Sequence, residues 1–196
     1  MASIIEEPRT PASRRLLTAE DLAALPEQLP SGPVKYELDQ GRLETVMAPP
    51  GEVHGSHQAT VVFLLKLHGQ RPGHGRVLGE TGIILRRNPD TVVAPDAAFI
   101  ASRSLPVEIS SEGYLLTIPE LVVEIRSKND TVAEMRARAE KYLRAGVQIV
   151  WLIDPGAKSM TVCRAQETRE VKIGDILTAE GVIPGFQVPV AELFGR

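Results

Sequence analysis

Cysteine is nearly absent from this 196-residue chain, which holds only Cys163. One cysteine cannot form an intrachain disulfide, and it cannot supply a cysteine-based zinc site. No apolar run reaches the roughly 18 residues that a membrane span needs, and the N-terminus is polar rather than signal-like. We therefore expect a protein of the reducing cytoplasm with no membrane partner.

The chain also has no excess of basic residues over acidic ones. The 25 Asp and Glu residues outnumber the 22 Lys and Arg residues, and the net charge is −3. The whole molecule is therefore not a basic binder of polyanions, although a local basic patch can still serve a nucleic-acid enzyme. The chain also lacks a Gly-x-Ser-x-Gly nucleophile elbow and a Gly-rich phosphate loop, so neither a serine hydrolase nor a phosphate-loop site has support.

The length fits one domain with a substantial core. Residues 1–16 carry little apolar periodicity and predict a flexible lead-in, which leaves 17–196 as a single folded domain. Apolar residues on both sides of Asp39-Gln40-Gly41 predict a β-hairpin from 34–38 and 43–47, as an N-terminal extension of that domain.

Apolar periodicity and turn residues predict alternating helices and strands, hence an α/β fold. A short helix begins with a Thr18–Asp21 capping pattern and ends by Pro26. Longer helices are expected over 56–67 and from a Thr131–Glu134 capping box to about Ala145, where Gly146 is a natural C-cap. The predicted strands are 77–85, 92–93, 97–100, 121–125, 147–153 and 159–164.

Glu124 stands out because it lies inside the apolar run 121–125, which is typical of a central strand covered on both faces. Burying a lone carboxylate costs several kcal/mol, so Glu124 must be paired, protonated or bound to a metal. Strand alternation places Glu124 and Arg126 on the same face, about 7 Å apart. We therefore expect this acid and this cation to project together.

Asp96 is the second candidate acid. It follows Pro95 at the start of a short strand, 28 residues before Glu124. Two converging carboxylates suit a hard divalent cation such as Mg²⁺, which can polarise a phosphate oxygen and activate water. A nearby cation can then stabilise the developing negative charge. Glu37, on a candidate strand near a turn, is a third acid that could complete the site.

Each of these residues also has a structural interpretation. Glu124 could form a salt bridge with Arg126 or another cation, Asp96 could belong to a Pro-Asp turn, and Glu37 could be a solvated strand residue. His54 and His57 suggest a zinc site, but two histidines three residues apart without a third ligand give it little support. A helix-start or substrate-side role suits His57 better.

Taken in order, these segments resemble the Uma-type restriction endonuclease family of the PD-(D/E)XK nuclease superfamily. The resemblance covers roughly residues 18–194, and the ordered set of motifs carries it rather than any one of them. The matching segments are Tyr36-Glu37-Leu38 with Gly41, Gly55 with His57, Ala94-Pro95-Asp96 with Phe99, the run 119–127 that contains Glu124, and the blocks from Tyr142 through Trp151-Leu152-Ile153-Asp154-Pro155 to Pro184-Gly185-Phe186.

The resemblance implies a restriction-endonuclease-like α/β fold with a central mixed β-sheet flanked by helices. It also implies hydrolysis of DNA phosphodiester bonds with Mg²⁺ or Mn²⁺, and commonly a homodimer. Asp96 matches the Asp of the family's Pro-Asp motif and Glu124 matches its second acid. The expected metal ligands are therefore Asp96, Glu124 and the carbonyl of Ile125, and Glu37 is expected to assist.

The chain departs from the superfamily pattern in its cations. Arg126 stands where a Lys is expected, and Arg cannot accept a proton near neutral pH. The family's substitute Lys, four residues before Tyr142, is here Arg138. Arg126 and Lys128 are the expected catalytic cations, and Lys141 is a further candidate. The alternatives are an inactive protein of the same fold with a binding or regulatory role, and a metal-dependent hydrolase of another phosphate ester.

Overall fold

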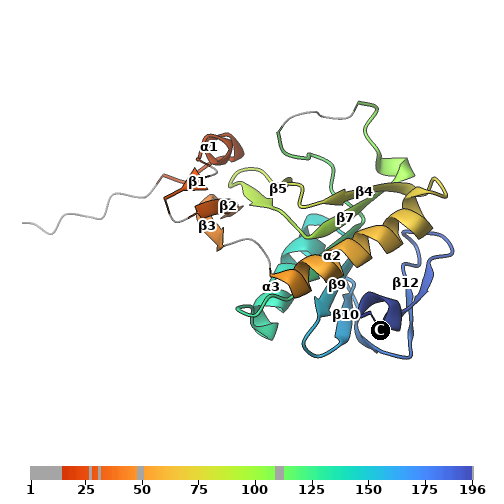
Figure 1. Ribbon diagram of the computed structural model, residues 1–196. Helices are drawn as coiled ribbons and strands as arrows, with labels where there is room; N and C mark the ends of the chain where they lie inside the picture. Colours follow the sequence, from red (N-terminus) through yellow and green to blue (C-terminus); the bar gives the residue numbers. More distant parts are fainter. Residues whose placement is uncertain (1–14, 27, 31, 48–50, 109–112, 196) are drawn as a thin grey trace, which may run out of the picture.

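The computed structural model describes residues 15–26, 28–30, 32–47, 51–108 and 113–195 (Figure 1). Most of the expected lead-in, residues 1–14, lies outside the described residues. At its end, Arg15 pairs with Asp21 at 2.7 Å, and the main chain of Leu17 is hydrogen-bonded to Gly41. The division between lead-in and domain stays a prediction.

A six-stranded mixed sheet forms the centre of the molecule, in the order β11-β10-β9-β8-β7-β4. The strands β8 and β9 are parallel, and every other neighbouring pair is antiparallel. The apolar run 121–125 is β8, and all five of its residues are buried, as expected for a strand covered on both faces. The bounds are β4 Gly75–Gly79, β7 Ala97–Ala101, β8 Leu121–Ile125, β9 Ile149–Asp154, β10 Ser159–Cys163 and β11 Thr168–Lys172.

Two helices cover the two faces of this sheet (Figure 1). The helix α2, Glu52–Leu65, continues as a π-helical turn over Lys66–Gln70 and packs on one face with the C-terminal segments. The helix α3, Val132–Ala145, packs on the other face. Alternation along β8 sends Val123 to the α2 side and Val122 to the α3 side, so Glu124 faces α3. The central sheet flanked by helices confirms the expected fold class.

The expected N-terminal hairpin is present. It is formed by β2, Gly32–Asp39, and β3, Arg42–Met47, and its turn uses positive φ angles at Gln40 and Gly41. A second sheet joins this hairpin to β1 (Gln28–Leu29), β6 (Thr91–Val93) and β5 (Ile83–Arg86). The short helix α1, Ala19–Ala23, begins at the expected Thr18 capping box.

The C-terminal segments complete the core on the α2 side. They comprise β12 (Ile176–Thr178), β13 (Gln187–Pro189) and a 3-10 turn over Val190–Leu193. Another 3-10 turn, Ser102–Ser104, follows β7. Leu177, Ile183, Phe186 and Leu193 are buried. Across the described ranges, no helix is both long and apolar enough to span a bilayer.

Two of the expected boundaries are wrong in ways that matter for function. The helix predicted over 56–67 begins four residues earlier, at Glu52, with Gly51 as its N-cap. The strand predicted over 77–85 is two strands, β4 and β5, in different sheets. The chain turns between them, where Glu80 has a φ of 46°. The earlier start of α2 brings His54 into the first helical turn.

Candidate metal centre

Asp96 lies immediately before β7, and its carboxylate is fixed against the end of β8. Its Oδ2 accepts a 2.7 Å hydrogen bond from the main-chain N–H of Ile125. Its carbonyl oxygen accepts a 3.0 Å bond from Nε2 of Gln58 in α2. The antiparallel register pairs Ala97 with Val123, which places Asp96 opposite Glu124 at the next step of the ladder. The two expected metal-binding acids therefore come together on neighbouring strands.

Glu124 is buried against α3, where two side chains four residues apart hold its carboxylate. The hydroxyl of Tyr142 donates a 2.6 Å hydrogen bond to Oε1. NH1 of Arg138 lies 3.4 Å from Oε2. A spacing of four residues places both donors on one face of the helix. Arg138 also reaches Asp130, whose Oδ1 lies 3.8 Å from NH2.

The electrostatics of this group favour added positive charge. Burial, and after it the negative charge of Asp96, raises the pKa of Glu124 to about 8, although Arg138 and Tyr142 oppose this rise. Burial likewise raises the pKa of Tyr142, and the charge of Glu124 adds to that effect. Two carboxylates held this close repel each other, because ionising one disfavours ionising the other. A bound cation would relieve that repulsion.

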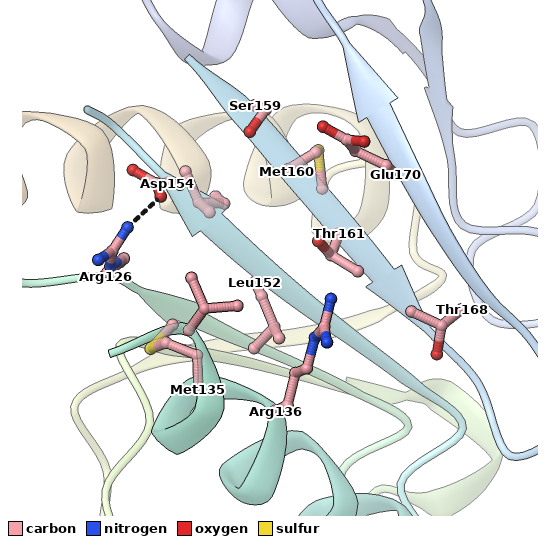
Figure 2. A pocket seen from close by; sticks show the side chains of 12 residues that line it. Arg126, Met135, Arg136, Leu152, Asp154, Ser159, Met160, Thr161, Thr168 and Glu170 are labelled. Atoms are coloured by element: carbon pink, nitrogen blue, oxygen red, sulfur yellow. Dashed lines mark hydrogen bonds and ion pairs between the residues drawn. The ribbon is translucent and has the colours of Figure 1, made fainter. Parts of the chain in front are cut away.

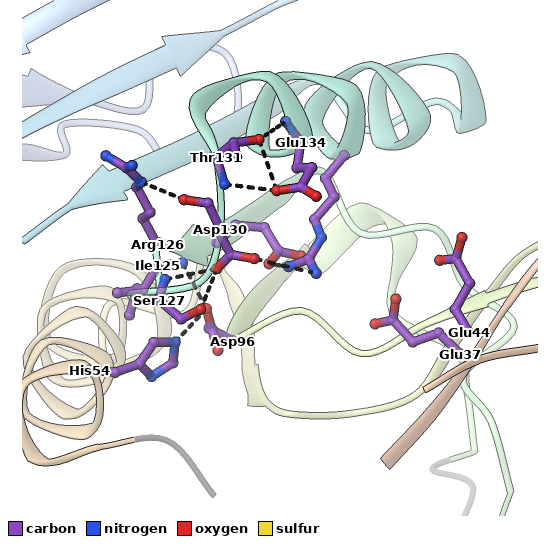
Figure 3. A network of polar contacts seen from close by, with 12 residues as sticks. Glu37, Glu44, His54, Asp96, Ile125, Arg126, Ser127, Asp130, Thr131 and Glu134 are labelled. Carbon is purple, nitrogen blue, oxygen red and sulfur yellow. Dashed lines mark hydrogen bonds and ion pairs between the residues drawn. The ribbon is translucent and has the colours of Figure 1, made fainter. Parts of the chain in front are cut away.

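His54 joins the two acids from the first turn of α2. Its Nε2 lies 3.3 Å from Oδ2 of Asp96, and its side chain is only 14% exposed. Figure 3 shows the imidazole directed at Asp96, beside Ile125. The hydrogen bond to Asp96 raises the pKa of His54, against burial, and the charge of Asp96 and the main chain of Ile125 add to the rise. The sequence pattern that marked this residue was the His54–His57 pair, but the expected helix began too late to place it at the site.

Glu37 lies at the margin of the group. Its Oε1 accepts a 2.9 Å bond from the N–H of Ala94, and it faces Glu44 across the hairpin. In Figure 3, Glu37 and Glu44 lie apart from Asp96 and His54. Burial raises the pKa of Glu37, although Arg138 and Lys141 act against this. The charges of Arg138 and Lys141 on α3 therefore act on Glu37. Its catalytic role stays a prediction.

Arg126 does not pair with Glu124, contrary to the expectation that the two would project together. Its NH1 lies 2.6 Å from Oδ2 of Asp154, and its Nε donates to the carbonyl of Asp130 at 2.9 Å. The strand β8 ends at Ile125, so the alternation that fixes Glu124 no longer directs the residue after it. The cation that contacts Glu124 is instead Arg138, fourteen residues further along the chain.

The side chain of Arg126 borders a separate hollow of about 420 Å³ (Figure 2). Arg136, Met135, Leu152 and Glu170 also line this hollow, which lies between α3 and the strands β9 to β11. In Figure 2 the Arg126–Asp154 ion pair stands at one end of it. The proposed catalytic role of Arg126 therefore needs its side chain to leave Asp154.

The two lysine candidates lie in different surroundings. Lys128 is exposed in the loop between β8 and α3. Lys141 binds the hairpin instead, with its Nζ 3.2 Å from Oδ1 of Asp39 and 3.7 Å from Oε2 of Glu44. Lys141 thus ties α3 to the N-terminal sheet, and the catalytic role of Lys128 stays a prediction.

The donor atoms fit a hard divalent cation in kind. Asp96 and Glu124 offer carboxylate oxygens, and the main chain of Ile125 lies beside them. Among the described residues, no three side chains of His, Cys, Asp or Glu are already gathered closely enough to hold a metal ion. Glu124 instead bonds to Arg138 and Tyr142. To bind the cation, the Glu124 carboxylate would have to give up its 3.4 Å contact with Arg138.

Comparison with known proteins places this architecture in the class of restriction-endonuclease-like proteins. The model of the Uma2 family, described as "Putative restriction endonuclease", matches residues 19–191. The chain belongs to this family, as the sequence resemblance indicated. No curated protein sequence matches it significantly.

A solved structure shares the fold over nearly its whole length. It is titled as a "putative nuclease belonging to DUF820" from Anabaena variabilis, with a TM-score of 0.74 and 21% sequence identity. The match covers 91% of this chain and 97% of the other. At this identity the likeness concerns the fold, and it confirms the expected fold class.

Proposed function

We propose that this chain is a divalent-cation-dependent endonuclease that hydrolyses DNA phosphodiester bonds with Mg²⁺ or Mn²⁺. Membership of a family described as restriction endonucleases supports DNA as the substrate. The convergence of Asp96 and Glu124 on neighbouring strands supports the metal. A homodimer and a cytoplasmic location remain predictions.

The observation that carries this proposal is the mutual repulsion of the two acids. Glu124 is buried, and the charge of Asp96 contributes to raising its pKa to about 8. A structural carboxylate gains nothing from a second acid beside it, because the repulsion costs stability. Metal sites that hydrolyse phosphate esters need such acids, since the bound cation polarises the phosphate and activates water.

The chain's own residues would divide the work. Asp96 is oriented by the Ile125 N–H, and Glu124 by the Tyr142 hydroxyl, so both carboxylates are positioned before a metal binds. The Arg138 guanidinium, which is about one third exposed, lies at the outer side of Glu124. A guanidinium there can bind a phosphate oxygen and stabilise the developing negative charge. Lys128 is the expected second cation.

One observation favours the inactive alternative. Arg138 contacts Glu124 directly, and an arginine that permanently caps this acid would exclude the metal. The contact is long at 3.4 Å, however, and the guanidinium is shared with Asp130. A cation bound by both Asp96 and Glu124 has to displace only the long Arg138–Glu124 ion pair. The metal-dependent enzyme is therefore better supported than the inactive alternative.

The proposal is tested by Asp96→Ala. The variant should lose metal-dependent nicking of supercoiled plasmid and cleavage of single-stranded circles, while circular dichroism and the urea unfolding midpoint show a folded protein. Asp175→Asn is the control, because Asp175 closes the distant turn before β12. Cleavage retained by purified Asp96→Ala would reject the assignment. Hydrolysis of bis(p-nitrophenyl) phosphate without DNA cleavage would instead support the phosphate-ester alternative.

A further inference from the structure

His54 approaches the acid pair in a way that an ordinary core histidine does not. Its Nε2 lies 3.3 Å from the same Oδ2 of Asp96 that the Ile125 N–H holds. Its Nδ1 is buried and has no hydrogen-bond partner among the described residues. The ring is therefore oriented by the contact of Nε2 with Asp96 rather than by a hydrogen bond of Nδ1.

The separation of the two atoms also fits a shared cation. A ligand atom lies about 2.1 Å from Mg²⁺ or from a transition metal bound by imidazole. Two such ligands are then about 3.0 Å apart at a right angle and about 3.4 Å apart at a tetrahedral angle, from the same bond lengths. The 3.3 Å between Nε2 of His54 and Oδ2 of Asp96 falls within that interval.

The position of His54 in the fold is equally specific. The N-terminus of α2 brings it to the end of β8, so that it meets Asp96 on the opposite side from α3 (Figure 3). Glu124 is held from the α3 side by Tyr142 and Arg138. The acids are thus enclosed by two helices, and the α2 side supplies a nitrogen donor.

We propose that Nε2 of His54 is an additional ligand of the divalent cation at Asp96 and Glu124, and that it shifts metal preference from Mg²⁺ toward transition metals such as Co²⁺. This inference rests on the metal site of the proposed function. Mg²⁺ prefers oxygen ligands, whereas imidazole suits the later divalent ions of the first transition row. A mixed nitrogen and oxygen site therefore gains more affinity for Co²⁺ than for Mg²⁺.

Pulsed electron paramagnetic resonance of the Mn²⁺-loaded wild-type protein tests the ligation directly. We expect a ¹⁴N coupling from a bound imidazole, and we expect His54→Ala to abolish it. His57→Ala is the matched control, because His57 lies one turn further along α2, with its Nδ1 2.7 Å from the Val53 carbonyl. It should keep the coupling. A bound Mn²⁺ without ¹⁴N coupling, or a coupling that survives in His54→Ala, would overturn the inference.

Calorimetric titration with Co²⁺ and with Mg²⁺ tests the metal preference. His54→Ala should lower Co²⁺ affinity at least about tenfold, the order seen when groups around a metal site are removed, and should lower Mg²⁺ affinity by less. Equal losses for both metals would overturn the claim of selectivity.

These outcomes separate this inference from the proposed nuclease activity. Nitrogen ligation in a protein that cleaves no DNA would sustain the inference and reject the endonuclease. A wild-type protein that binds no divalent cation would reject both. Cleavage with a metal that shows no nitrogen ligand would leave the endonuclease standing and reject the role of His54.

Discussion

The hydroxyl of Tyr142 donates a 2.6 Å hydrogen bond to Oε1 of Glu124, and both side chains are buried. This contact joins the last turn of α3 to the central strand β8. It gives the acid a fixed orientation while leaving its other oxygen to the longer Arg138 contact. The stability of the core and the orientation of the Glu124 carboxylate thus depend on the same hydrogen bond.

Tyr142→Phe should reduce the free energy of unfolding by about 1–3 kcal/mol, because the buried carboxylate loses a donor and gains none in its place. Urea denaturation at pH 7 in EDTA measures the change. Tyr36→Phe removes the same hydroxyl from the distant hairpin and serves as the control. If Tyr142→Phe unfolds at the wild-type urea concentration, the hydrogen bond does not contribute to stability.

The ionisation of Glu124 should make the metal-free protein less stable as the pH rises. Burial and the charge of Asp96 raise its folded pKa to about 8, from an ordinary value of 4.5. Between these values the folded state keeps a proton that the unfolded state has lost, so the free energy of unfolding falls with rising pH. Below the lower value both states are protonated, and above the upper value both are ionised, so the effect levels off.

Glu124→Gln should therefore flatten the dependence of stability on pH between about 4.5 and 8. Urea midpoints in EDTA, taken at several pH values, measure the slope. Glu140→Gln, at an exposed position of α3 that pairs with Arg144, should keep the wild-type slope. Identical slopes for wild type and Glu124→Gln would contradict the role given to this carboxyl.

Arg138→Ala should lower kcat for plasmid cleavage by about 100-fold, since removing one charge-stabilising donor from an active site costs on that order. Arg138→Lys restores the family's substitute Lys on this helix and should retain most of the activity. Arg136→Ala is the control, because Arg136 lines the hollow beside Arg126 instead of the acid pair. Unimpaired cleavage by Arg138→Ala would show that another cation, such as Lys128, serves the phosphate.

The cap of α3 should also contribute measurably to stability. Thr131 accepts from the N–H of Glu134, and the Glu134 carboxylate accepts from the N–H of Thr131. Thr131→Ala should cost about 0.5–2 kcal/mol, measured by thermal or urea unfolding. Thr60→Ala, within α2, should be close to neutral because Ala is a better helix former. Equal effects of the two substitutions would argue against a specific contribution from the cap.

The sequence by itself determined those features whose causes are local. The capping boxes at Thr18 and Thr131 set the starts of α1 and α3, and Gly146, with a φ of 106°, ends α3. The continuous apolar run identified β8 as a buried strand. Its single acid, Glu124, required a partner because a lone buried carboxylate is costly, and the ordered motifs indicated the family that the comparison then showed.

The tertiary structure alone decided which groups meet that acid. Strand alternation set the face of Glu124, but only the packing of α3 on that face brought Arg138 and Tyr142 to it. Arg126 turned to Asp154 because β8 ends one residue before it. His54 reached Asp96 because α2 begins at Glu52 and lies across the sheet. Contacts between segments distant in the chain depend on how whole helices and strands pack, and local sequence patterns do not specify that packing.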